Sequence, residues 1–241
     1  MGRRGLILIL MLSVGCGLAY ADTITVTGVD STRGEYGLWI NELGTPKSVY
    51  YAGVINILLN QTYSRDSLCA QLFVDIGFGT YYTTVMSPSE AQQAYGRNLE
   101  EAAWLVDNEL PAVTTSAQGA ALQLAIWDIV EDGGDGLASG SVAVSSDLNN
   151  PTDPTVLGLA NSYEQDALGP DLQGPFQTSD LAFVYVNTDS GGSAAQMLVG
   201  PQFQDNGPQP APEPSTFALG GGGLVAAGFL TYRSRKAVPA S

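Results

Sequence analysis

Two residues of this chain, Cys69 and Gln123, have side chains that can react with each other without a cofactor. Cys69 is the lone thiol of the expected exported part, because Cys16, the other cysteine, lies in the N-terminal leader. The apolar run around Cys69 predicts a buried strand, and a single thiol cannot form an internal disulfide. Gln123 is the polar exception in an apolar stretch with helical character, Gly119 to Trp127. A buried amide without a partner costs about 1–3 kcal/mol, so Gln123 needs one.

The chemistry that joins these two groups is thioester formation. A Cys69 thiolate that attacks the Gln123 side-chain carbonyl would expel ammonia and leave an internal thioester. Amides are poor electrophiles, so the proximity of the two groups must lower much of the activation barrier. Effective molarities of about 10⁵ M in intramolecular reactions show that proximity can have an effect of this size. Gly119 and Ala120, one turn earlier, leave room for another segment to approach, and Trp127, one turn later, can cover the amide. The alternative is an inert buried thiol and a buried amide.

Helices and strands must bring the pair together. Ser116 is expected to cap a helix that runs from Ala117 to about Asp132, and the capping sequence 87–90 predicts an earlier helix that continues to Pro111. Strands are expected on both sides of these helices, at 23–29, 36–40, 49–59, 68–75, 181–187 and 195–199. This order predicts an α+β fold, a β-sandwich or barrel-like sheet with a central helical subdomain, plus a C-terminal transmembrane helix.

The residues from Gln123 to Trp127, Gln-Leu-Ala-Ile-Trp, resemble a motif in the thioester domains of bacterial surface adhesins. That family pairs a strand cysteine with the glutamine of Thr-Gln-x-Ala-apolar-Trp, and Leu122 stands here at the threonine position. The resemblance extends diffusely from about Tyr50 to Val199. It implies that a lysine amine on a target surface opens the thioester and leaves an isopeptide-type link.

The C-terminus has the order of a surface-sorting signal. The tripeptide Pro212, Glu213 and Pro214 precedes an apolar run at 215–232, and Arg233 and Arg235 follow it. About 18 helical residues span roughly 27 Å, close to the hydrocarbon thickness of a bilayer. The arrangement resembles the PEP-CTERM tail, which implies processing by exosortase, a membrane protease, and export to the envelope or matrix. The alternative is a plain C-terminal anchor that is not cut.

The N-terminus predicts export as well. Arg3 and Arg4 precede an apolar stretch, and Ala19-Tyr20-Ala21 supplies the small residues of a signal-peptidase site. A lipoprotein signal at Cys16 is the alternative, although Ser13 stands where a lipobox has leucine. We therefore divide the chain into a signal peptide at 1–21, an ectodomain at 22–200, a proline-rich linker at 201–214 and a sorting signal at 212–236 with its transmembrane helix.

Composition excludes several functions. With 24 acidic against 9 basic residues, the formal net charge of −15 disfavours binding to nucleic acid. The chain has no histidine, which removes the Ser-His-Asp and Cys-His nucleophiles and histidine metal sites. A carboxylate-only glycosidase stays open, but no acid pair stands out. The acidic runs 131–136 and 147–153 lack the EF-hand spacing and are interpreted as solvated turns, so neither a metal nor a cofactor is predicted.

These observations predict an exported, envelope- or matrix-associated binding or adhesion protein rather than an enzyme. Its expected partners are an exosortase-type protease, the membrane through the C-terminal helix, and an amine-bearing surface or matrix target reached through the Cys69–Gln123 thioester. One alternative is a non-covalent structural protein of the extracellular matrix on the same scaffold. A carboxylate-based glycoside hydrolase is the third possibility.

Overall fold

The computed structural model describes residues 22–34, 36–42, 45–144, 153–169 and 182–201. Its strands are β1 (Asp22–Val29), β2 (Tyr36–Glu42), β3 (Thr45–Ala52), β4 (Ile55–Leu59), β5 (Tyr63–Cys69), β6 (Gly79–Met86), β7 (Ala143–Val144), β8 (Phe183–Thr188) and β9 (Leu198–Gly200). Its helices are α1 (Pro88–Tyr95), α2 (Leu99–Asn108), the 3-10 turn η1 (Leu110–Ala112), α3 (Ser116–Asp132) and α4 (Pro154–Leu168).

The predicted signal peptide, linker, sorting signal and membrane helix at 215–232 all lie outside the described residues. Among the residues that the structure describes, none of the helices has both the length and the apolar character needed to cross a bilayer.

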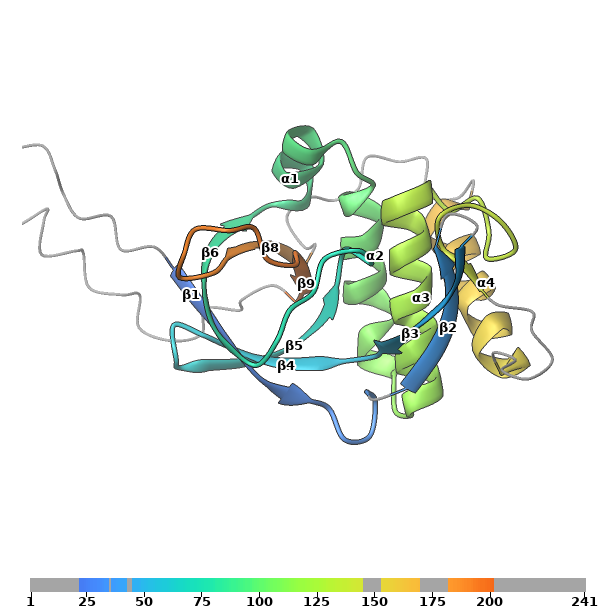
Figure 1. The fold of residues 1–241 in the computed structure, drawn as a ribbon, viewed down its shortest axis with the longest axis horizontal. Helices are drawn as coiled ribbons and strands as arrows, with labels where there is room; N and C mark the ends of the chain where they lie inside the picture. The colour runs from blue at the N-terminus through green and yellow to red at the C-terminus, as the bar shows by residue number, and fades with distance from the viewer. Residues whose placement is uncertain (1–21, 35, 43–44, 145–152, 170–181, 202–241) are drawn as a thin grey trace, which may run out of the picture. The chain divides into compact units, whose positions relative to one another are not determined.

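Six strands close into an antiparallel barrel in the order β1-β4-β5-β9-β8-β6, and β1 pairs with β6 to complete it. A separate sheet, β3-β2-β7, lies beside the helices (Figure 1). The strands and helices therefore segregate, and the prediction of a barrel-like sheet that carries helices is confirmed.

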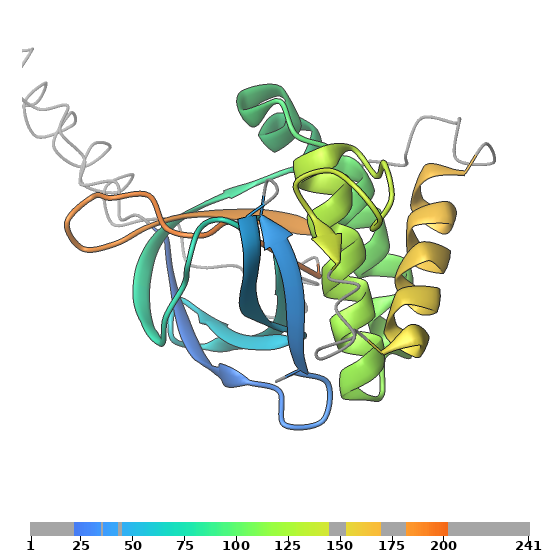
Figure 2. The ribbon, with the colours of Figure 1, turned by 45° about the vertical axis from the view of Figure 1, so that its right-hand side comes forward.

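The helix α3 occupies the centre of the helical layer. It contacts α2, α4, β2, β3 and β5, and Figure 2 shows α4 on the side of α3 that faces away from the barrel. Every residue from Gly119 to Val130 is buried, which explains why this helix is apolar all round rather than amphipathic.

The helix boundaries depend on local caps. Thr115, not Ser116, caps α3: its side chain accepts the N–H of Gln118 in a capping box, and the backbone of Thr115 is extended. The predicted capping box at Ser87 is confirmed. The single helix expected from there to Pro111 is instead divided into α1 and α2, because Gly96 ends α1 in the left-handed conformation with φ of 65°.

The strand predictions need several corrections. The strand expected at 49–59 is two strands in different sheets, because the chain turns at Gly53, whose φ is 133°. The strand expected at 68–75 begins earlier, at Tyr63, and ends at Cys69. The strand β6 and the helix α4 were not predicted, and the last strand begins at Leu198 rather than at Ala195.

Candidate functional site

The structure brings Cys69 and Gln123 into direct contact. The backbone N–H of Cys69 donates to Oε1 of Gln123 at 2.8 Å, and Nε2 of Gln123 donates to the backbone oxygen of Cys69 at 2.6 Å. Gln123 is buried, with 1% of its surface exposed, and the two residues are 54 positions apart in sequence. The helix carboxamide and the strand cysteine therefore meet through a pair of hydrogen bonds.

The end of a strand explains this pairing. The strand β4 begins opposite Ser67, where Ile55 and Ser67 are partners, so β4 does not reach Cys69. Ala70 is bonded on the opposite edge, where its N–H donates to the backbone oxygen of Met197. The N–H and C=O of Cys69 thus point to the edge that β4 leaves open, and the side-chain amide of Gln123 takes the place of a strand peptide there.

A second contact from the same helix holds the chain just after Cys69. Glu131 accepts the backbone N–H of Leu72 at 3.2 Å, and its other oxygen pairs with Arg97 at 2.5 Å. Two turns of α3 therefore separate two anchors for the segment 69–72. This segment cannot shift away from Gln123 without breaking the bond to Glu131.

The three shielding residues predicted from the sequence lie in different surroundings. Gly119 supports the close approach of another segment, because a β carbon there would lie only 1.9 Å from the backbone oxygen of Arg33. Ala120 is fully buried in the hydrophobic core. Trp127 is 2% exposed, and its ring meets the ring of Tyr50 edge-on at 6.1 Å between centroids. Gly119 and Ala120 therefore pack α3 into place, while Trp127 lies beside the pair.

A pocket of about 370 Å³ opens beside Cys69. Its apolar walls include Trp127, Tyr50 and Leu72, and its polar side chains include Asp75 and Gln196. Cys69 therefore forms part of the wall of this pocket. Sequence reasoning missed Asp75, because only the tertiary fold places the segment after β5 in the same pocket as Cys69.

The electrostatic surroundings keep the Cys69 thiol protonated. Desolvation, with added repulsion from the Asp75 carboxylate, raises the pKa of this thiol to about 12. Cys69 nevertheless retains partial exposure, because it lines the pocket. A thiol with this pKa is neutral at pH 7, so nucleophilic attack requires an acceptor for its proton.

Comparison with known families identifies the C-terminal segment. Residues 210–236 match the PEP-CTERM protein-sorting motif. All five predicted sorting residues, Pro212, Glu213, Pro214, Arg233 and Arg235, fall inside this match. The motif implies an exported protein that is sorted at the membrane and processed by exosortase, a membrane protease.

Comparison with solved structures found the N-terminal thioester domain of fibronectin-binding protein SfbI from Streptococcus pyogenes. The two chains are 10% identical, the TM-score is 0.40, and the alignment covers 73% of this chain and 98% of that one. A search of curated protein sequences found no significant match.

Proposed function

We propose that this protein is an exported, envelope- or matrix-associated adhesion protein that attaches to amine-bearing targets through a thioester between Cys69 and Gln123. The observation that carries the proposal is the paired contact between the Gln123 carboxamide and the Cys69 backbone at the edge of a pocket. The PEP-CTERM motif at 210–236 supplies the route to the cell surface.

The proposed thioester would form at this contact. The Cys69 sulfur bonds to the side-chain carbonyl carbon of Gln123, the C–N bond breaks, and the thiol proton leaves with the nitrogen as part of ammonia. The N–H of Cys69, 2.8 Å from Oε1, stabilises the negative charge that develops on this oxygen. Asp75, whose charge acts on the thiol, is the group that we assign to accept the thiol proton and pass it on.

In the second step, the attack of an amine on the thioester, the pocket is the route by which the amine enters. A primary amine that enters between Trp127 and Asp75 attacks the thioester carbonyl, forms an amide with the Gln123 side chain and releases the Cys69 thiol. A lysine ammonium is attracted by the Asp75 carboxylate, which then accepts its proton and leaves the nucleophilic amine. Each molecule reacts once, so the protein acts as a covalent binder and not as an enzyme.

A non-covalent structural role is the second candidate function. The Gln123 amide already satisfies both backbone groups of Cys69, and a buried amide with two partners is stable without further chemistry. In this case the same contact simply closes the open edge of β5. The glycoside hydrolase has less support, because among the described residues the pocket is lined by one carboxylate, Asp75, whereas that chemistry uses two.

Amine incorporation tests the proposal. The purified full chain is incubated with a fluorescent primary amine, and labelled peptides are mapped by mass spectrometry. We expect one label per chain on Gln123, and no label on a Cys69→Ala variant, which keeps the backbone partners of Gln123. Absence of label from the wild-type chain would favour the structural role, and equal label on Cys69→Ala would show that the amine reacts without a thioester.

A further inference from the structure

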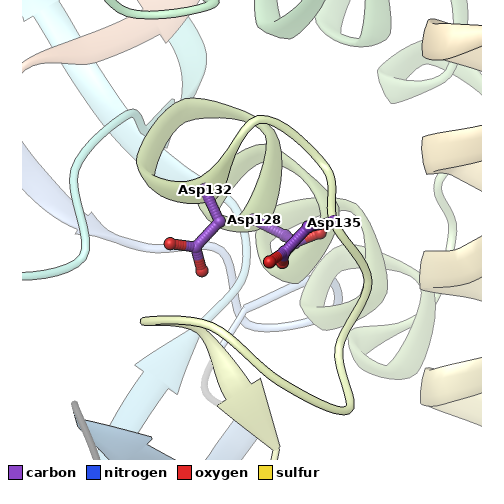
Figure 3. Close-up of side chains that lie close together, drawn as sticks. All are labelled: Asp128, Asp132 and Asp135. Carbon is purple, nitrogen blue, oxygen red and sulfur yellow. The ribbon is translucent and has the colours of Figure 1, made fainter.

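Three aspartates gather where α3 ends. Asp128 and Asp132 lie one turn apart on the helix, Asp135 follows in the turn after it, and Figure 3 shows the three side chains close together where the helix ends. One carboxylate oxygen from each lies within 4.8 Å of the others. Oxygens that bind one Ca²⁺ at 2.3–2.6 Å can be at most about 5 Å apart, so this spacing suits a single ion.

The buried member of this cluster lacks a partner. Asp128 is 0% exposed; its Oδ2 accepts the N–H of Gly136 at 3.1 Å, but its Oδ1 is buried with no hydrogen bond. A buried carboxylate oxygen is normally satisfied by a donor, a water molecule or an ion. The unpaired oxygen of Asp128, in a residue whose carboxylate lies close to those of Asp132 and Asp135, therefore indicates a ligand at this cluster.

A further buried carboxylate lies on the helix that packs against α3. Glu164 on α4 is 5% exposed, and its Oε1 has no hydrogen-bond partner. None of these four carboxylates forms an ion pair with a residue that the structure describes, whereas Asp30, Asp66 and Glu131 each pair with an arginine. The cluster therefore has no cationic partner among the described residues, and a bound metal ion would supply the missing positive charge.

The turn that follows α3 keeps the cluster in place. The backbone N–H groups of Ser141 and Val142 donate to Oδ2 of Asp132 at 2.7 and 2.8 Å. The chain thus leaves the helix at Asp132, passes through Asp135 and returns to the carboxylate of Asp132 at Ser141 and Val142. The cluster is held by the fold and does not depend on the conformation of a free loop end.

We propose that Asp128, Asp132 and Asp135 bind a Ca²⁺ ion at the end of α3. A set made only of oxygen ligands suits a hard cation, and the irregular arrangement suits Ca²⁺ better than Mg²⁺, which demands a near-octahedral shell. The site lies apart from the Cys69 pocket and is independent of the thioester. The acidic run 131–136 did not reveal it, because Asp128, its buried member, lies within the preceding helix.

Thermal unfolding of the purified full chain tests this site. After treatment with EDTA, the chain is titrated with CaCl₂ or, separately, with MgCl₂. At 100-fold excess over the dissociation constant, calcium should raise Tm by about 5–10 °C for a domain of this size. Equilibrium dialysis with radioactive calcium should show one ion per chain. Magnesium at the same concentration should raise Tm by less than half as much.

Two variants make the test specific. Asp135 is exposed, so Asp135→Asn should fold normally, lose the calcium-dependent rise in Tm and bind calcium at least tenfold more weakly. Asp166→Asn is the matched control: it removes one exposed carboxylate from the same helix as Glu164 and should keep the full response. The site is refuted if calcium leaves Tm unchanged, if magnesium acts equally well, or if Asp135→Asn responds as Asp166→Asn does.

Discussion

Replacing Gln123 by methionine removes one contact and little else. Methionine has almost the same length and volume as glutamine, so the variant leaves no large cavity in α3. What it loses is the acceptor for the Cys69 N–H at 2.8 Å and the donor to the Cys69 oxygen at 2.6 Å. Both backbone groups then lie at an open strand edge, where no neighbouring strand replaces the amide.

The cost follows from these two groups. A buried polar group without a partner costs about 1–3 kcal/mol, and the partial exposure of Cys69 places each group in the lower half of this range. We therefore expect Gln123→Met to lower the free energy of unfolding by about 2–4 kcal/mol when it is compared in the Cys69→Ala background, where neither chain can hold a thioester. Urea denaturation followed by tryptophan fluorescence measures this difference, and the slope of the transition should be unchanged.

A matched control and a second variant separate the effect of the hydrogen bonds from other effects on stability. Gln93→Ala alters an exposed glutamine on α1 and should change the stability by less than about 0.5 kcal/mol. Cys69→Ala keeps both hydrogen bonds, because the partners of Gln123 are backbone atoms. A thioester between two positions 54 apart would restrict the unfolded chain and stabilise the fold by up to roughly 4 kcal/mol. If it forms, Cys69→Ala should lose part of this stabilisation. A Gln123→Met variant in the Cys69→Ala background that is as stable as Cys69→Ala alone would refute the importance of the contact.

Three further predictions follow from the described residues. Gly119→Ala should lower the free energy of unfolding by at least about 2 kcal/mol, because its β carbon would lie 1.9 Å from a backbone oxygen. Gly158→Ala on α4 is the control: its β carbon would meet nothing within 4 Å, so it should raise this free energy by up to about 1 kcal/mol. Urea denaturation measures both changes. Asp75→Asn should slow amine incorporation by about 10²-fold in a labelling time course, and an unchanged rate would exclude Asp75 as the proton acceptor. The Arg33 side chain bonded to Asp30 lowers the pKa of Asp30 to about 2; this contribution to stability is present above pH 3.8 and is lost as the pH falls towards 2. Asp30→Asn should therefore lower the urea midpoint at pH 7 and have little effect at pH 2.

The parts of the site that depend on local sequence pattern could be predicted from the sequence. The helix that carries Gln123 was predictable because a capping residue precedes a long apolar run, and burial on all sides explains that run. The approach of a second segment at Gly119 was predictable from the absence of a side chain. The meeting of Gln123 with Cys69 was inferred from chemistry, since a buried amide and a lone thiol each needed an explanation.

Other features depend on tertiary contacts that leave no local trace. The strand through Cys69 ends there because α3, and not another strand, supplies the next hydrogen bonds, through Gln123 and Glu131. The strand β6 escaped prediction because its side chains are mostly exposed or half-buried threonines and tyrosines, with no apolar alternation. The start of α4 did carry a signal: Asp153 accepts the N–H of Thr155 and Pro154 is the first helical residue.

The mass of the intact chain tests the thioester most directly. The protein is purified without reductant or amine buffers, its termini are assigned by peptide mapping, and its mass is compared with that of Cys69→Ala prepared in the same way. The account predicts a wild-type mass lower by one ammonia than its sequence requires, and a Cys69→Ala mass that agrees with its sequence. A wild-type mass that equals the sequence value, together with a free Cys69 thiol after unfolding, would contradict the covalent function.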